Sequence, residues 1–173
     1  DTGFRQDLDR AKSISLLAIA NHVFLGTNRG RIQSFLERGG SIRCVLMDPR
    51  GVALPMAADL AFGYDRQSKN LAAQVMLSVE ELRELEQQFG QESVQLKFAN
   101  FLPQAVITIL EHRDGDATMY VTLNGVNQPS SARPSFRLRK SVDPKWYSFY
   151  QESFENLWQW DQAETIDLET YEI

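Results

Sequence analysis

Hydrophobic positions along this chain recur at two different spacings, which is typical of a protein that combines helices and strands. Near-continuous apolar runs at 13–20 and 41–48 have the length and character of strands covered on both faces. Between them, apolar residues at three- and four-residue steps predict a helix over 28–38 that ends at Gly39 and Gly40. Two strands joined by one helix form a right-handed parallel pair. We therefore expect an α/β fold with a mixed, mostly parallel sheet flanked by helices.

The remaining segments show the same two periods. Alternating apolar and polar residues indicate strands, and the RDGD turn at 113–116 joins two of them into a hairpin. Asp143 followed by Pro144 is typical of a helix start, and the aromatic stripe of that helix is expected to pack on the sheet. The further predicted elements are a helix at 3–12, one or two helical turns at 54–62, a helix at 67–89, a strand at 93–99, a hairpin at 105–123, a loop at 124–131, an edge strand at 134–141 and a helix at 144–160.

Length and charge restrict the classes of protein that fit. A chain of 173 residues with 43% apolar residues suits one domain, which we place at 1–160. Residues 161–173 hold five acids and no base, and we expect an acidic tail that frays or docks on a partner. Without that tail the net charge of −5 disappears, so bulk charge does not support nucleic-acid binding.

The cellular setting follows from what is missing. No apolar stretch approaches the roughly 20 residues that cross a bilayer, and no signal segment is visible. We expect a cytoplasmic protein without membrane contact, in which the single cysteine, Cys44, is an inert buried thiol. The chain begins with Asp1 rather than methionine, which favours a domain excised from a longer protein; processing or the choice of expressed segment would also explain it.

Few residues offer catalytic chemistry. His22 follows the first predicted strand, where open α/β sheets bind ligands, and is either a ligand contact or general base or an ordinary loop histidine. His112 belongs to the hairpin turn and is expected to be solvated. The chain has no metal-ligand spacing, no Gly-x-Ser-x-Gly elbow and no phosphate-binding glycine pattern. The sequence thus predicts no metal and no cofactor.

Anion recognition is the chemistry that the remaining polar residues support. Polar groups stand at the expected strand ends, and a basic run extends from Arg133 to Lys145. The planar fork of arginine matches phosphate or carboxylate oxygens, so a pocket using Arg133 or Arg139 is reasonable. The alternative is an edge strand that its charges protect from aggregation. The candidate ligand-binding residues are His22, Asp48, Arg50, Asn124, Arg133 and Arg139.

The order of the elements resembles the phospholipase D superfamily over most of the chain. The similar features are a helix leading into AKSISLLAI, a helix ending in FLERGG, the strand and turn SIRCVLMDPRG, a long helix, the hairpin at 105–123 and a closing FYQESFENLW helix. Active members carry His-x-Lys followed four residues later by Asp on the first hairpin strand, and their histidine attacks phosphorus. Here that register places Gln104, Val106 and Glu111 at the three positions, and TLNG at 122–125 is a weak echo of the family's Gly-Ser-x-Asn stretch. The resemblance therefore implies a relative that has lost catalysis.

These observations lead to one main hypothesis and two alternatives. The main hypothesis is a non-catalytic ligand-sensing or protein-interaction domain of a larger bacterial regulatory protein. It would bind a small anionic ligand at the former active-site mouth, and the resemblance implies pairing into a homodimer or docking to other domains. The first alternative is a phosphodiesterase or nuclease with a rearranged site around His22. The second is a scaffold whose aromatic helix at 144–160 docks another domain.

Overall fold

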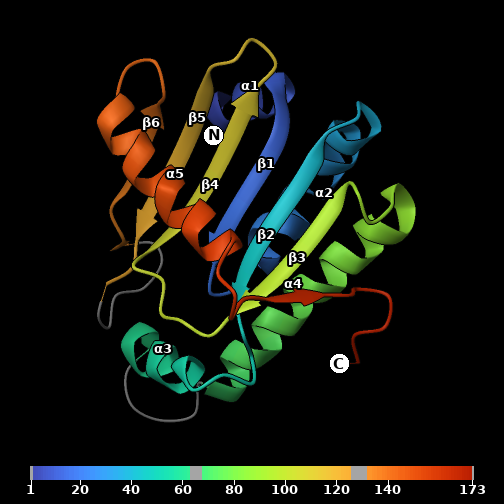
Figure 1. Cartoon of the computed structure of the whole chain (residues 1–173), viewed down its shortest axis with the longest axis vertical. Coiled ribbons are helices and arrows are strands. Elements are labelled where there is room, and N and C mark those ends of the chain that lie inside the picture. The colour runs from blue at the N-terminus through green and yellow to red at the C-terminus, as the bar shows by residue number, and fades with distance from the viewer. Residues whose placement is uncertain (1, 63–67, 126–131, 173) are drawn as a thin grey trace.

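The computed structural model describes residues 2–62, 68–125 and 132–172 and resolves five helices and seven strands in them. The helices are α1 (Thr2–Arg10), α2 (His22–Glu37), α3 (Ala53–Phe62), α4 (Ser68–Phe89) and α5 (Pro144–Trp158). The strands are β1 (Ala11–Ala18), β2 (Ser41–Met47), β3 (Val94–Ala99), β4 (Ala105–His112), β5 (Ala117–Leu123), β6 (Ser135–Arg139) and β7 (Glu164–Ile166). All seven strands form one sheet in the order β6-β5-β4-β1-β2-β3-β7 (Figure 1).

Strand pairing confirms the α/β class and the mixed sheet but corrects the balance of directions. β1 pairs with β2 and β2 with β3 in parallel, as the predicted strand–helix–strand unit requires. The other four pairings in the described part, β1–β4, β4–β5, β5–β6 and β3–β7, are antiparallel. The expectation of a mostly parallel sheet is therefore wrong. Of these four, only the β4–β5 pair is closed by a short turn, at 113–116, which forces antiparallel neighbours; β1–β4 and β3–β7 join segments that are far apart in the sequence.

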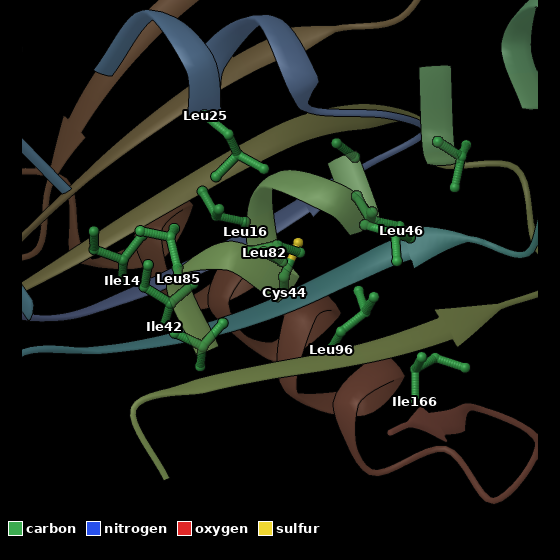
Figure 2. Packing of buried hydrophobic residues seen from close by; sticks show 14 of the residues in the cluster. Ile14, Leu16, Leu25, Ile42, Cys44, Leu46, Leu82, Leu85, Leu96 and Ile166 are labelled. Carbon is green, nitrogen blue, oxygen red and sulfur yellow. The ribbon is translucent and has the colours of Figure 1, made fainter. Parts of the chain in front are cut away.

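The larger core fills the space between one face of the sheet and helices α1, α2, α3 and α4. In Figure 2, Leu25 of α2 and Leu82 and Leu85 of α4 lie over apolar side chains of β1, β2, β3 and β7. Cys44 belongs to this cluster and is buried as predicted, and that burial raises the pKa of its thiol well above the ordinary value and so disfavours the thiolate. The described helices and strands up to residue 99 therefore all contribute to this core.

Helix α5 covers the other face, where it lies across the sheet in Figure 1. Arg43 of β2 anchors it, because its guanidinium bonds the Glu155 carboxylate at 2.6 and 3.1 Å and lies 5.1 Å from the Phe154 ring centroid. The aromatic stripe packs only in part: Trp146 and Phe149 are 60% and 58% exposed. A helix buries one stripe, and here that stripe includes the fully buried Tyr147 and Phe154.

The C-terminal segment differs from the predicted acidic tail. Glu164–Ile166 pairs with β3 as β7, and Leu168 is fully buried. Arg83 of α4 donates to the backbone carbonyls of Leu168 and Tyr171 and so ties the segment to the helix. The prediction that 161–173 frays is therefore wrong. Ile166 and Leu168 are both buried in the core, although acidic residues stand next to them in the sequence.

Helix boundaries agree with the sequence except at α2. The sequence predicts a start at 28, whereas the helix begins at His22 and its buried stripe already includes Leu25. Gly26 and Thr27 obscure that first turn in the sequence, so His22 is a helical residue rather than a loop residue. The loop predicted at 124–131 lies outside the described residues from 126 onward. No described helix is both long and apolar enough to cross a membrane.

The close approach of Gly40 to Phe35 gives a stability test. A Cβ at Gly40 would overlap the Phe35 ring, which is fully buried and has no room to withdraw. We expect Gly40→Ala to lower the free energy of unfolding by about 1–3 kcal/mol. In the matched variant Gly30→Ala the new Cβ meets nothing within 4 Å in α2, and stability is expected to rise by about 0.5–1 kcal/mol. Urea unfolding of both variants checks this, and equal stabilities would contradict the packing.

Candidate functional site

A pocket of about 640 Å³ opens where β1 and β5 end and α2 begins. β1 and β5 are both antiparallel to β4, so their carboxyl ends meet at the same edge of the sheet. Helix α4 closes one side of the pocket with Leu71 and Gln74. The described residues that line it are Ile19, Ala20, Asn21, His22, Val23, Phe24, Thr27, Asn28, Leu71, Gln74, Val106, Thr122, Asn124 and Arg133.

Asn21 is the most buried polar side chain in this lining, with 9% of its surface exposed. Its backbone N–H donates to Ser78 Oγ at 2.8 Å, and Ser78 in turn donates to the carbonyl of Gln74 at 2.9 Å. The side chain makes no cap bond to the first amides of α2, and its Nδ2 is buried without a partner in the described structure. A buried donor without a partner lowers the stability of the fold by about 1–3 kcal/mol, a cost that a bound acceptor would remove.

His22 contributes a second atom of the same kind. It is half-buried as the first residue of α2, and its Nδ1 is buried without a hydrogen-bond partner among the residues described. Nδ1 of an imidazole either accepts or donates, depending on the tautomer. The structure thus confirms that His22 stands at the carboxyl end of a strand beside a cavity.

Arg133 and Asn124 form the opposite wall. Arg133 Nη1 donates to Asn124 Oδ1 at 3.0 Å, and Asn124 Nδ2 donates to the carbonyl of Pro103 at 2.8 Å. The backbone N–H of Asn124 also donates to the carbonyl of Gln104 at 2.9 Å. Two bonds, one from its side chain and one from its backbone, therefore hold Asn124 beside the residues that precede β4, and its amide oxygen accepts from the half-buried guanidinium of Arg133.

The electrostatics of the pocket differ from those of the chain. The protein carries a net charge of −5, yet the described lining contains one arginine, one histidine and no carboxylate. The 16-residue helix α2 directs its N-terminus here, where unpaired backbone N–H groups and the helix dipole favour negative charge. Together with the unpaired Nδ2 of Asn21, these groups form a set of donors suited to an anion.

Two other candidates, Asp48 and Arg50, lie outside this pocket. Arg50 Nε donates to Asp48 Oδ1 at 3.0 Å, and its Nη2 bonds the Glu164 carboxylate of β7. The guanidinium also lies 5.9 Å from the ring centroids of Phe98 and Tyr171. Both carboxylates raise the pKa of Arg50. These contacts fasten the C-terminal segment to the end of β2, so the pair has a structural role.

Arg139 lies at the opposite end of the sheet from Arg133. In the β5–β6 register, Arg139 pairs with Thr118 while Ser135 pairs with Thr122. Its guanidinium is 3.7 Å from Asp116 in the hairpin turn. The structure thus brings together His22, Asn124 and Arg133 and separates them from Asp48, Arg50 and Arg139.

Sequence reasoning missed other residues of the pocket. Gln74 of α4 and Thr122 of β5 line it, as does Phe24 of α2. No local signal in the sequence places α4 beside the end of β1. Val106, which stands at the lysine position of the phospholipase D register, also lines the pocket, whereas Glu111 accepts a bond from Ser13 Oγ at 3.1 Å.

His112 is buried, contrary to the prediction of a solvated turn residue. It closes β4 rather than the turn, is fully buried, and neither ring nitrogen has a partner among the described residues. The reason is strand alternation, because His112 and the core residue Leu110 share the face that α1 covers. Desolvation, followed by the charge of Arg10, lowers the pKa of His112, while Asp7, Asp114 and Asp116 oppose that shift.

Comparisons with known proteins place the fold but not a family. No family model matches the chain, and no curated protein matches it. A similar solved structure is that of TrmBL2, an archaeal chromatin protein described as showing a novel mode of DNA binding. The two are 14% identical with a TM-score of 0.52, and the match covers 95% of this chain. This chain corresponds to about half of TrmBL2, 49% of its length, and at this identity the likeness concerns the fold alone.

The burial of His112 predicts a pH dependence of stability. Its pKa in the folded protein lies below the unfolded value of about 6.5, so the unfolded chain binds more protons in this range. Stability is therefore lost as the pH falls through the unfolded pKa. We expect His112→Leu to weaken the drop in urea midpoint between pH 7.5 and pH 5, and to stabilise the protein more at pH 5. An unchanged drop would mean that His112 is not buried as a neutral group.

Proposed function

We propose that this domain is a non-catalytic sensor of a small anionic ligand within a larger regulatory protein, and that the ligand binds between α2 and the ends of β1 and β5. The observation that carries the proposal is the buried, unpartnered Nδ2 of Asn21 beside a helix N-terminus. A phosphate or carboxylate at this place would accept from Asn21 and from the first amides of α2. Arg133, whose guanidinium donates to Asn124, would supply positive charge beside the anion.

The lining also indicates the chemistry of the rest of the ligand, beyond its negatively charged group. Ile19, Val23, Phe24, Leu71 and Val106 give the pocket a mostly apolar wall. Its volume of about 640 Å³ lies within the range of small-molecule sites. We infer a ligand with one anionic end and a compact apolar or aromatic body, rather than a bare inorganic ion.

The resemblance to the phospholipase D superfamily supports a sensor more than an enzyme. At the positions of the family's histidine and lysine stand Gln104 and Val106, and Val106 faces this pocket. An anion site without the attacking imidazole and ammonium would retain binding and lose phosphoryl transfer. The DNA binding of TrmBL2 is not proposed for this chain, because the described lining holds a single arginine and the chain is acidic.

The alternative enzyme is a phosphodiesterase that uses His22. The imidazole lies in the pocket, which favours this alternative, but the described lining offers no carboxylate to orient it. Purified protein is expected not to hydrolyse bis(p-nitrophenyl) phosphate above background. Turnover that disappears in His22→Ala would replace the sensor proposal with the enzyme.

Binding of phenyl phosphate tests the sensor directly, with titration calorimetry as the measurement. We expect Arg133→Gln to weaken binding by roughly ten-fold or more, as the loss of a charge-assisted bond does. Asn21→Asp replaces the buried donor by a carboxylate and is expected to remove binding. The matched control is Arg139→Gln, which makes the same change of charge at the far end of β6 and should bind as the wild type does.

Two further probes identify which part of the ligand is recognised. Inorganic phosphate is expected to bind more weakly than phenyl phosphate, because it leaves the apolar wall uncovered. Binding of benzoate would show that the pocket accepts a carboxylate as well as a phosphate. Equal affinity of the Arg133→Gln and Arg139→Gln variants, with both folded by circular dichroism, would show that phenyl phosphate binds elsewhere and would overturn the assignment.

A further inference from the structure

A second pocket, of about 560 Å³, lies where α4 meets the outer edge of β3 beside β7. Strand β7 pairs with β3 only from Leu96 to Phe98, so no described strand pairs with the first residues of β3 on that side. The described residues that line the opening are Glu86, Gln91, Glu92, Val94, Gln95, Leu96, Lys97, Trp158, Thr165, Ile166 and Asp167. This lining contains three carboxylates, whereas the described lining of the pocket at the start of α2 contains none.

Glu86 is the unusual group in this second pocket. Its side chain belongs to a residue that is only 5% exposed, and its Oε2 is buried without a partner in the described part of the chain. The nearby cation, Arg83, directs its donors elsewhere, to Glu80 and to the carbonyls of Leu168 and Tyr171. A buried carboxylate without a donor is strongly unfavourable, so a cation at this place would stabilise the ionised side chain.

The surroundings add acceptors rather than donors. Glu92 and Asp167 supply two further carboxylates to the lining. The only basic residue of the described lining, Lys97, donates its Nζ to the carbonyl of Trp158 at 2.7 Å and lies 5.0 Å from that indole centroid. Lys97 therefore secures α5 to the sheet and leaves the Glu86 oxygen unmatched.

We propose that this pocket binds a small organic cation with N–H donors, a primary ammonium or a guanidinium, and that Glu86 is its counter-ion. Directional N–H groups suit a buried carboxylate and the amide oxygens of Gln91 and Gln95. A metal ion is a poorer match, because nowhere in the described chain do three His, Cys, Asp or Glu side chains come together as ligands. The site is independent of the anion pocket, which shares no lining residue with it.

Protonation provides a specific signature of this binding. Desolvation, with the charges of Glu169 and Asp167, raises the pKa of Glu86, and Arg83 opposes the shift. The other charged groups facing the pocket are Glu92 and Lys97. A bound cation favours the charged carboxylate, so in the pH range where Glu86 titrates binding releases protons and strengthens as the pH rises. A merely structural Glu86 would not couple proton release to the probe.

The experiment is calorimetric titration with methylguanidinium and with 1,4-diaminobutane, repeated in buffers of different ionisation enthalpy. Intrinsic tryptophan fluorescence, to which Trp158 in the lining contributes, is recorded alongside. We expect saturable binding with proton release. Glu86→Gln is expected to weaken binding at least ten-fold while keeping the fold, since the amide removes a buried charge and preserves the shape. The matched control is Glu152→Gln, an exposed residue of α5 outside this pocket, which should bind as the wild type does.

The other outcomes overturn the proposal. Unchanged binding in Glu86→Gln would place the probe elsewhere. Equal binding of tetramethylammonium, which has no N–H donor, would show simple charge attraction. Saturable binding of Mg²⁺ with none of either organic cation would make the site inorganic, and no binding of any probe at millimolar concentration would remove it.

Discussion

The double burial of β1 is the constraint on which the rest of the structure depends. This strand is the fourth of seven and joins the parallel half of the sheet to the antiparallel half, with α1, α2 and α4 on one face and α5 on the other. Because both faces are covered, a slip of one residue would exchange two packed sets of side chains. Its register is therefore fixed, and so is the point where it releases the chain into α2. The pocket at Asn21 exists because β1 ends there.

The sequence predicts the parts of this arrangement that depend on local period. The strand–helix–strand unit, the hairpin around 113–116 and α5 follow from spacing and turn residues. Strand β7 does not, because three residues that begin with Glu164 are too short to show a period and gain their place only from the edge of β3. The position of His112 was mispredicted for the same reason. The turn residues beside it are typical of a solvated hairpin end, whereas α1, which is distant in the sequence, buries it.

The candidate site was predictable where a strand end defines it and not elsewhere. His22 and Asn124 follow β1 and β5, and the rule that ligands meet carboxyl ends of strands identifies them. Arg139 does not reach the pocket because the strand β6, which begins two residues after Arg133 and spans about 17 Å, carries it to the other end of the sheet. Gln74 required the docking of α4 on α2, a tertiary contact with no local signal.

Helix α4 links the two proposed pockets. It places Gln74 at the donor-rich pocket and Glu86 at the acceptor-rich one, about 18 Å apart along the axis of a single helix. Bonds to Asn21 through Ser78 and to the C-terminal segment through Arg83 hold the middle of the helix in place, between the two pockets. Each pocket keeps a buried polar atom unpaired in the described structure, which costs stability. An anion in one pocket and a cation in the other would each offset the cost of the buried group it pairs with. Each ligand would therefore stabilise the fold by an amount set by its own concentration relative to its own dissociation constant.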